Sequence, residues 1–195
     1  MSPGHDARRG GATLPCLGAV IAGGTSSRMG TTKAEIDVGG VTLGLRAIRT
    51  LRRVADEVIQ VGGAPIEGGG IEVIPDRRPG LGPAAGIETA LHRADGPVVI
   101  LAVDLPRVSA ALLTECLRAV HAGAAAAAPR TDRWHPLCAA YGLAALEPLS
   151  ARLDAEDLSL QELLDATSAV AINAPPGSLR NVNRPQDLEA IRRRS

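Results

Sequence analysis

The stretch LGAVIAGGTSSRMGTTK, from Leu17 to Lys33, decides the fold, because it joins a short apolar run to a glycine-rich segment. The run from Leu17 to Ala22 has the length and apolar character of a β-strand that is buried on both faces. Gly23 and Gly24 then end it. A buried strand followed at once by a glycine-rich loop is typical of α/β proteins that bind a ligand at the end of a strand.

The loop itself has the composition of an anion-binding site. Its glycines allow positive φ angles and let the backbone come close to a ligand. Successive backbone N–H groups can bind an anion, and Arg28 and Lys33 add two positive charges for a triphosphate. The spacing matches neither a P-loop nor GxGxxG. A flexible loop with two solvated cations remains an alternative at this point.

Strand-like and helix-like segments alternate after this loop, with connections of a few residues. The sequence predicts helices over about 43–54, over 86–94 and from an N-cap at Ser109 to about 122, and strands over 58–61, 71–74, 98–103 and 124–128. Such alternation predicts an α/β fold of three layers, in which a mostly parallel, Rossmann-like sheet is covered on both faces.

The pattern changes after Arg130. We expect a strand over 135–141, helices over 143–153 and 158–164, a short strand over 169–172 and a closing helix over 185–193. These segments would finish the sheet and build a smaller lobe. Residues 1–15 carry Gly, Arg and Pro without a period, so we expect them to form a disordered leader.

Composition excludes several classes of function. Lys plus Arg equal Asp plus Glu at 21 each, and aromatic residues make up 1% of the chain, so neither nucleic acid nor a membrane surface is an expected partner. No apolar run approaches the roughly 20 residues of a membrane span. The three cysteines are far apart and form no CxxC pair, which argues against a zinc site and indicates reduced thiols in a cytoplasmic protein.

Asp104 follows the strongest strand of the chain, in the segment Leu101-Ala-Val-Asp-Leu-Pro106. A carboxylate at the carboxyl end of a buried strand is well placed to hold a divalent cation, since Mg²⁺ is usually bound by one or two carboxylates together with substrate phosphates. Asp104 could instead only cap the strand or the next turn, and the residues alone support the two interpretations equally.

Two further segments carry candidate binding residues. Pro75 to Gly86 is a stiff Gly/Pro loop between a strand and a helix, and Asp76 in it could accept a hydrogen bond from a sugar or a base. A purely structural Ω-loop is the rival interpretation. Asn181 and Asn183 have one residue between them and project to the same side of an extended chain, where they could bind a polar ligand or form a turn before Pro185. His135, beside Pro136, is more typical of a structural role.

Taken together, these motifs resemble the molybdenum cofactor guanylyltransferases, a MobA-type branch of the nucleotide-diphospho-sugar-transferase-like fold. The similar segments are AGGTSSRMGTTK at 22–33, PGLGPAAG at 79–86, VDLP at 103–106 and NVNRPQDL at 181–188. The resemblance extends from Leu17 to about Ile191.

The resemblance implies an enzyme that transfers GMP from GTP, with Mg²⁺, to the molybdopterin cofactor and releases pyrophosphate. It implies a single domain over 16–195, whose part 16–128 binds nucleotide and whose part 129–195 binds the acceptor. Molybdoenzymes and cofactor-biosynthesis proteins are candidate partners. The implied roles are nucleotide binding for Ile21, Ala22, Gly23, Gly24, Lys33, Asp76 and Asp104, catalysis for Arg28, Lys33 and Asp104, metal binding for Asp104, and acceptor binding for Asn181 and Asn183.

The chain departs from the family pattern in places. Thr32 stands where many relatives have Asp, and Val61 or Gly62 stands where relatives place a polar residue near the nucleotide. Transfer of CMP to the same cofactor, or of a nucleotide to another phosphorylated metabolite, is the alternative activity. A non-catalytic nucleotide-binding module is the third hypothesis, and the joint presence of Arg28, Lys33 and Asp104 argues against it.

Overall fold

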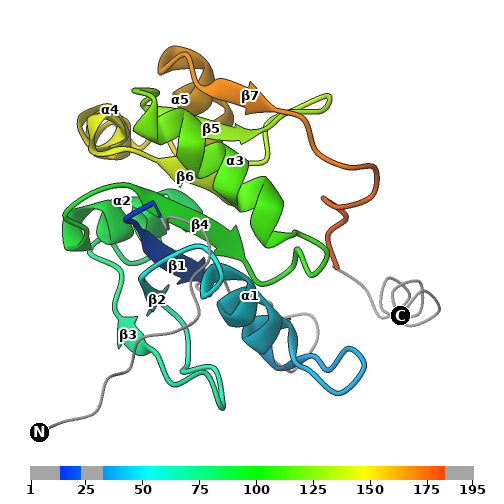
Figure 1. The fold of residues 1–195 in the computed structure, drawn as a ribbon. Helices are drawn as coiled ribbons and strands as arrows, with labels where there is room; N and C mark the ends of the chain where they lie inside the picture. The colour runs from blue at the N-terminus through cyan, green and yellow to red at the C-terminus, as the bar shows by residue number, and fades with distance from the viewer. Residues whose placement is uncertain (1–13, 23–32, 183–195) are drawn as a thin grey trace, which may run out of the picture.

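Seven strands form one sheet in the computed structural model, which describes residues 14–22 and 33–182. Their order is β3-β2-β1-β4-β6-β5-β7 (Figure 1). The strands are β1 (Leu17–Ile21), β2 (Glu57–Val61), β3 (Glu72–Ile74), β4 (Val98–Ala102), β5 (Ala126–Pro129), β6 (Cys138–Tyr141) and β7 (Val170–Ile172). β1 pairs in parallel with β2 and β4, whereas β6 runs antiparallel between β4 and β5. The prediction of a mostly parallel sheet is therefore confirmed.

Helices cover both faces of the sheet. They are α1 (Leu43–Leu51), α2 (Pro83–Arg93), α3 (Ala110–His121), α4 (Leu146–Asp154) and α5 (Leu160–Ala166), with two 3₁₀ turns, η1 (Lys33–Glu35) and η2 (Leu143–Ala145). α1 and α3 pack on one face, and α2, α4 and α5 pack on the other (Figure 1). The predicted three layers are confirmed.

The core consists of small and aliphatic side chains arranged by the two-residue period of the strands. In β1, Val20 contacts the cluster under α1 and α3, while Ala19 and Ile21 contact the cluster under α2, α4 and α5. Alternate side chains of a strand point to opposite faces, so a continuously apolar strand fills both cores. This explains why β1 and β4 are buried along their whole length.

Helix boundaries follow local capping chemistry. The Ser109 hydroxyl accepts a hydrogen bond from the Leu112 N–H at 3.3 Å, which confirms the predicted N-cap of α3. α2 begins at Pro83 rather than at the predicted residue 86, because proline fits the first helical turn, where its missing N–H has no partner to lose. The strand expected over 135–141 begins only at Cys138, since residues 135–137 turn back from β5. The closing helix expected over 185–193 lies outside the described residues.

Among residues 14–22 and 33–182, no helix has both the length and the apolar character needed to cross a lipid bilayer.

Candidate functional site

The carboxyl edge of the sheet gathers the segments that the sequence singles out. β1 lies between β2 and β4 in the sheet. The connection from β1 to β2 contains α1, which packs on one face, whereas the connection from β3 to β4 contains α2, which packs on the other face. Such a switch of direction opens a crevice at the carboxyl ends of the two central strands, where α/β proteins bind ligands. Ile21 and Ala22 lie there, at the end of β1. Gly23, Gly24 and Arg28 lie outside the described residues.

Lys33 and Asp104 meet at this edge. Lys33 opens η1, which is anchored by the buried Ala34, and Asp104 follows the end of β4. The Lys33 Nζ lies 3.5 Å from the Asp104 Oδ2, and the two side chains are 28% and 20% exposed. The ammonium and the carboxylate are therefore both within reach of a ligand that enters from solvent.

The C-terminal segment closes on the same point. The Val182 N–H donates a hydrogen bond to the Asp104 backbone oxygen at 2.9 Å, and the Val182 side chain is buried in the core. This contact places the exposed Asn181 beside the Asp104 segment. Asn183 lies outside the described residues. The structure thus brings three motifs that are distant in the sequence, at Lys33, Asp104 and Asn181, to one place.

Asp76 occupies the other side of the edge, after β3. Its Oδ1 lies 3.5 Å from where a side-chain Cβ on Gly86 would stand, and Ile21 lies within 3.3 Å of the same position. The Oδ1 atom is buried and has no hydrogen-bond partner among the described residues. Burial raises the pKa of the Asp76 carboxyl above its ordinary value. An acceptor atom without a protein partner, next to the end of β1, is suited to accept a hydrogen bond from a ligand.

Gln60 shapes the wall of the edge after β2, and sequence reasoning did not assign it a role. Its side chain is fully buried, donates to the Gly62 and Ala64 oxygens at 2.8 and 2.7 Å, and accepts from the Ile66 N–H at 3.1 Å. The signal in the sequence was a lone polar residue within an apolar strand. The Gln60 side chain is therefore engaged by the loop after β2 itself, in which Gly63 lies against Ala22.

Gly63 makes the closest backbone approach at this edge. Its φ is +72°, and a Cβ at this residue would lie 2.8 Å from the Ala22 carbonyl oxygen. The Ala22 N–H also bonds to the Val61 oxygen at 3.2 Å. The exit of β1 toward the glycine-rich loop is therefore in close contact with the loop after β2, and any side chain at residue 63 would have to displace the Ala22 carbonyl.

The connection between β5 and β6 lies at the same edge, because β5 runs parallel to β4. Trp134 is buried in it and donates from its indole N–H to Asp165 at 2.8 Å, with the Arg130 guanidinium 4.7 Å from its ring centroid. Its neighbour His135 contacts the Thr131 hydroxyl at 3.2 Å. Burial, and then the charge of Arg133, lower the pKa of His135. These two effects favour the neutral form of the His135 ring.

The residues at this edge fit a divalent cation that is bound together with phosphates. Asp104 supplies one hard carboxylate, and the described residues contain no group of three His, Cys, Asp or Glu side chains that could hold a metal alone. Mg²⁺ usually retains waters and binds through one or two carboxylates plus substrate phosphates, so one carboxylate is sufficient.

Cysteine chemistry does not contribute to the site. All three cysteines are free and buried. Burial, reinforced by Asp56, raises the pKa of Cys16 to about 12, and burial together with Glu115 raises that of Cys116 to about 12. A thiol with such a pKa is almost entirely protonated at pH 7 and is a poor nucleophile.

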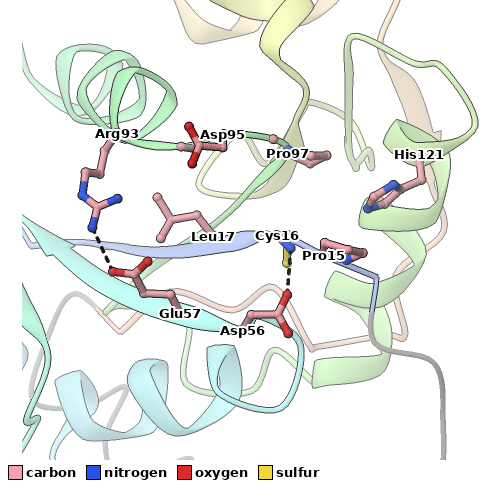
Figure 2. Close-up of a pocket in the computed structure, with 11 residues that line it drawn as sticks. Pro15, Cys16, Leu17, Asp56, Glu57, Arg93, Asp95, Pro97 and His121 are labelled. Carbon is pink, nitrogen blue, oxygen red and sulfur yellow. Dashed lines mark hydrogen bonds and ion pairs between the residues drawn. The ribbon is translucent and has the colours of Figure 1, made fainter.

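A cavity of about 450 Å³ lies at the opposite, amino edge of the sheet (Figure 2). It is lined by the beginnings of β1, β2 and β4, with Asp56, Glu57 and Asp95 as its carboxylates. Glu57 is paired with Arg93 at 3.1 Å. None of the candidate residues within 14–22 and 33–182 lines this cavity, so its size is no guide to their position.

Comparison with known proteins gives a consistent result. A family model described as a MobA-like NTP transferase domain matches residues 18–176. The chain is 33% identical to a probable molybdenum cofactor guanylyltransferase of Opitutus terrae, covering 91% of this chain and 95% of that protein. It is 32% identical to the molybdenum cofactor guanylyltransferase of Rhodobacter capsulatus, covering 88% and 92%.

A solved structure of a molybdopterin-guanine dinucleotide biosynthesis protein A from Archaeoglobus fulgidus has the same fold. The TM-score is 0.76 at 24% identity, covering 91% of this chain and 97% of that one.

Proposed function

We infer the activity from the premise that this chain belongs to the MobA-like NTP transferase family and is a nucleotidyltransferase. We propose that it transfers GMP from GTP to the molybdopterin cofactor, forming the guanine dinucleotide cofactor and pyrophosphate. One observation carries the proposal beyond the family name: Lys33, Asp104 and the Asn181 segment meet at the carboxyl edge, where the Lys33 Nζ is 3.5 Å from the Asp104 Oδ2 and the Val182 N–H bonds to Asp104.

The reaction joins two phosphates. A terminal phosphate oxygen of the acceptor attacks the α-phosphorus of GTP, the bond from that phosphorus to the bridging oxygen breaks, and pyrophosphate leaves with the electron pair. The attacking oxygen is already anionic at neutral pH, so no general base is required. Catalysis is then mainly positioning and charge neutralisation, as in phosphoryl transfer generally.

The residues have separate roles in this proposal. Lys33 and Arg28 bind the triphosphate and offset the charge that builds on the leaving pyrophosphate, while the backbone from Ile21 to Gly24 binds the nucleotide. Asp104 would hold Mg²⁺, which neutralises phosphate charge when bound. Asp76 supplies a carboxylate to the nucleotide from the β3 side, in agreement with its unpartnered Oδ1.

Acceptor binding is assigned to Asn181 and Asn183. The position of Asn181 beside the Asp104 segment supports this, because the acceptor phosphate must reach the phosphorus that the cation and Lys33 bind. The division into a nucleotide part over 16–128 and an acceptor part over 129–195 belongs to the same proposal. So does a cytoplasmic location, which is supported by three thiols that are free.

A nucleotide panel tests the activity. The protein is incubated with the molybdopterin cofactor, Mg²⁺ and GTP, CTP or ATP, and pyrophosphate and the dinucleotide product are measured, with omission of acceptor as the blank. We expect turnover with GTP alone. Equal turnover of CTP would assign CMP transfer, and nucleotide binding without pyrophosphate release from any of the three would assign a binding module.

Two variants test the roles. Asp104→Asn and Lys33→Ala are each expected to lose on the order of 3 kcal/mol of transition-state stabilisation, roughly a hundredfold in rate. Asp95→Asn is the matched control, because its carboxylate lines the cavity at the amino edge and should leave the rate unchanged. Near-wild-type rates for Asp104→Asn at low Mg²⁺ would remove Asp104 as the metal ligand.

A further inference from the structure

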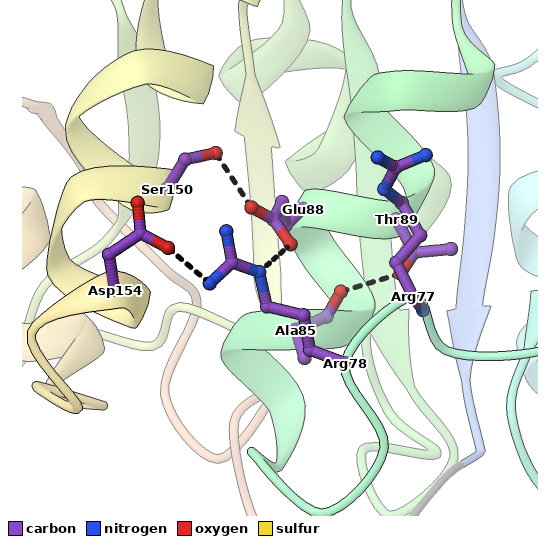
Figure 3. A network of polar contacts seen from close by, with 7 residues as sticks. All are labelled: Arg77, Arg78, Ala85, Glu88, Thr89, Ser150 and Asp154. Carbon is purple, nitrogen blue, oxygen red and sulfur yellow. Dashed lines mark hydrogen bonds and ion pairs between the residues drawn. The ribbon is translucent and has the colours of Figure 1, made fainter.

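An ion network with one buried member lies beside the loop that carries Asp76 (Figure 3). The Arg78 Nε donates to the Glu88 Oε2 at 2.9 Å, and the other Glu88 oxygen accepts from the Ser150 hydroxyl at 2.7 Å. A terminal guanidinium nitrogen of Arg78 donates to Asp154 at 2.5 Å. The network therefore joins the loop after β3 to α2, through Glu88, and to α4, through Ser150 and Asp154.

The two halves of this network differ in burial. The Glu88 side chain is 2% exposed, whereas that of Asp154 is 68% exposed. A buried carboxylate that loses its partner is strongly unfavourable, while an exposed ion pair contributes little. Glu88 is therefore the partner that holds Arg78 in place, and Asp154 is an accessory contact.

The adjacent residue is fixed to the same helix. The Arg77 N–H donates to the Thr89 hydroxyl at 3.0 Å, and this hydroxyl donates to the Ala85 oxygen at 2.8 Å. The side chains of Arg77 and Arg78 diverge, with that of Arg78 directed toward α4 (Figure 3). Two consecutive residues after Asp76 are thus attached to α2, although the segment beyond them includes Gly80 and Gly82 at positive φ.

These attachments affect the position of the Asp76 carboxylate. Its buried Oδ1 has no hydrogen-bond partner among the described residues, so no hydrogen bond of that atom holds the carboxylate beside Gly86 and Ile21. The chain that follows it is attached to α2 by the Arg77 N–H and by the Arg78 side chain, and these two contacts restrict where the carboxylate can lie.

We propose that Arg78, held by the buried Glu88, is a positioning residue for GTP binding that acts through Asp76 and does not touch the nucleotide. The inference rests on the proposed function, because it assumes that Asp76 contacts the nucleotide. According to this proposal, GTP affinity depends on an arginine that binds two protein carboxylates, through its Nε and through a terminal nitrogen.

The test measures the dissociation constant of GTP by calorimetry, without acceptor, together with KM and kcat and the urea midpoint of each variant. We expect Arg78→Ala to weaken GTP binding about tenfold while kcat at saturating GTP changes less than about threefold. Arg78→Lys should restore part of the affinity, since an ammonium can pair with Glu88 but cannot span both carboxylates. Asp154→Asn is the matched control and should change affinity less than about twofold.

A double-mutant cycle separates positioning from direct contact. In an Asp76→Asn background, Arg78→Ala should weaken GTP binding by no more than about twofold further, because its effect passes through Asp76. Full additivity of the two changes would overturn the proposal, and so would an unchanged GTP affinity in Arg78→Ala alongside a lowered urea midpoint.

If Arg78→Ala does not fold, the double variant Arg78→Met/Glu88→Leu removes both charges and leaves no buried charge unpaired. It should fold and still bind GTP about tenfold more weakly, and wild-type affinity in this variant would overturn the proposal. The wild-type affinity for each nucleoside triphosphate is measured first and tests the proposed function separately. The ratio of variant to wild-type affinity, for whichever nucleotide the wild type binds, tests the positioning role.

Discussion

Replacing Gly63 by alanine tests whether the close approach of the loop after β2 to the end of β1 controls the glycine-rich segment proposed to bind nucleotide. The new Cβ would stand 2.8 Å from the Ala22 carbonyl oxygen, on a residue whose φ is +72°. Gly68→Ala is the matched control, because its φ is +69° and the nearest atoms, in the Leu45 side chain, are 3.8 Å away, which is ordinary contact. The two changes therefore share the backbone strain and differ only in the clash.

The expected magnitudes follow from these distances. A left-handed backbone costs an alanine about 1–2 kcal/mol, part of which is offset because alanine also restricts the unfolded chain, so Gly68→Ala should lose about 1 kcal/mol. Gly63→Ala must also displace the Ala22 carbonyl by on the order of 0.5 Å. This movement strains the Ala22 N–H to Val61 hydrogen bond of 3.2 Å. The weakened bond adds up to about 1 kcal/mol, for a total of up to about 2 kcal/mol.

Urea unfolding and GTP calorimetry on both variants provide the measurement. Because Ala22 leads directly into Gly23 and Gly24, a displacement of this size should weaken GTP binding on the order of tenfold in Gly63→Ala. Gly68→Ala should bind GTP as the wild type does. Equal losses of unfolding free energy and equal GTP affinities in the two variants would refute the reasoning.

Three further changes give checkable results. Burial raises the pKa of Asp76, and a carboxyl whose pKa is higher in the folded than in the unfolded chain destabilises the fold once the pH rises through the folded-state pKa. Asp76→Asn should therefore raise Tm at pH 7 and not at pH 3, while GTP affinity falls roughly tenfold or more; a lower Tm at pH 7 would contradict this. The Lys33 Nζ lies 3.5 Å from the Asp104 Oδ2, so the ammonium competes with a metal cation for this carboxylate. In a paramagnetic resonance titration without nucleotide, Lys33→Ala should therefore bind Mn²⁺ about fivefold more tightly than the wild type. An unchanged Mn²⁺ affinity would exclude the competition. Gln60→Leu removes three hydrogen bonds from the loop after β2 and should lower the urea-measured stability by about 2–4 kcal/mol, whereas a loss below 1 kcal/mol would mean that the loop holds without them.

The apolar runs predicted most of the fold because each is a local signal. β1 and β4 are continuous runs buried on both faces, and α3 begins at the capping serine that the sequence indicates. The direction of β6 has no such signal, since Cys138–Tyr141 is as small and apolar as a parallel strand would be. Pairing direction depends on the connection, and the short turn after β5 leaves room only for an antiparallel return.

The candidate site was predictable as a set of residues but not as a geometry. The sequence motifs indicated Lys33, Asp76, Asp104 and Asn181 as candidate residues. The topology of the sheet explains why they lie at its carboxyl edge. The contacts of Val182 with Asp104 and of Arg78 with Glu88 join segments far apart in the chain, and no local pattern encodes them. Gln60 was visible as a polar residue in an apolar strand, yet only its three hydrogen bonds reveal that it serves the loop.

The scarcity of aromatic residues gives the molecule a built-in optical probe. Trp134 is the only tryptophan of the chain, and it lies 4% exposed in the connection between β5 and β6, at the carboxyl edge of the sheet, with Arg130 over its ring. Indole emission responds to the polarity and charge around the ring. Ultraviolet excitation of the unlabelled protein therefore reports on a single known position, and stopped-flow mixing can time events at that edge without any dye.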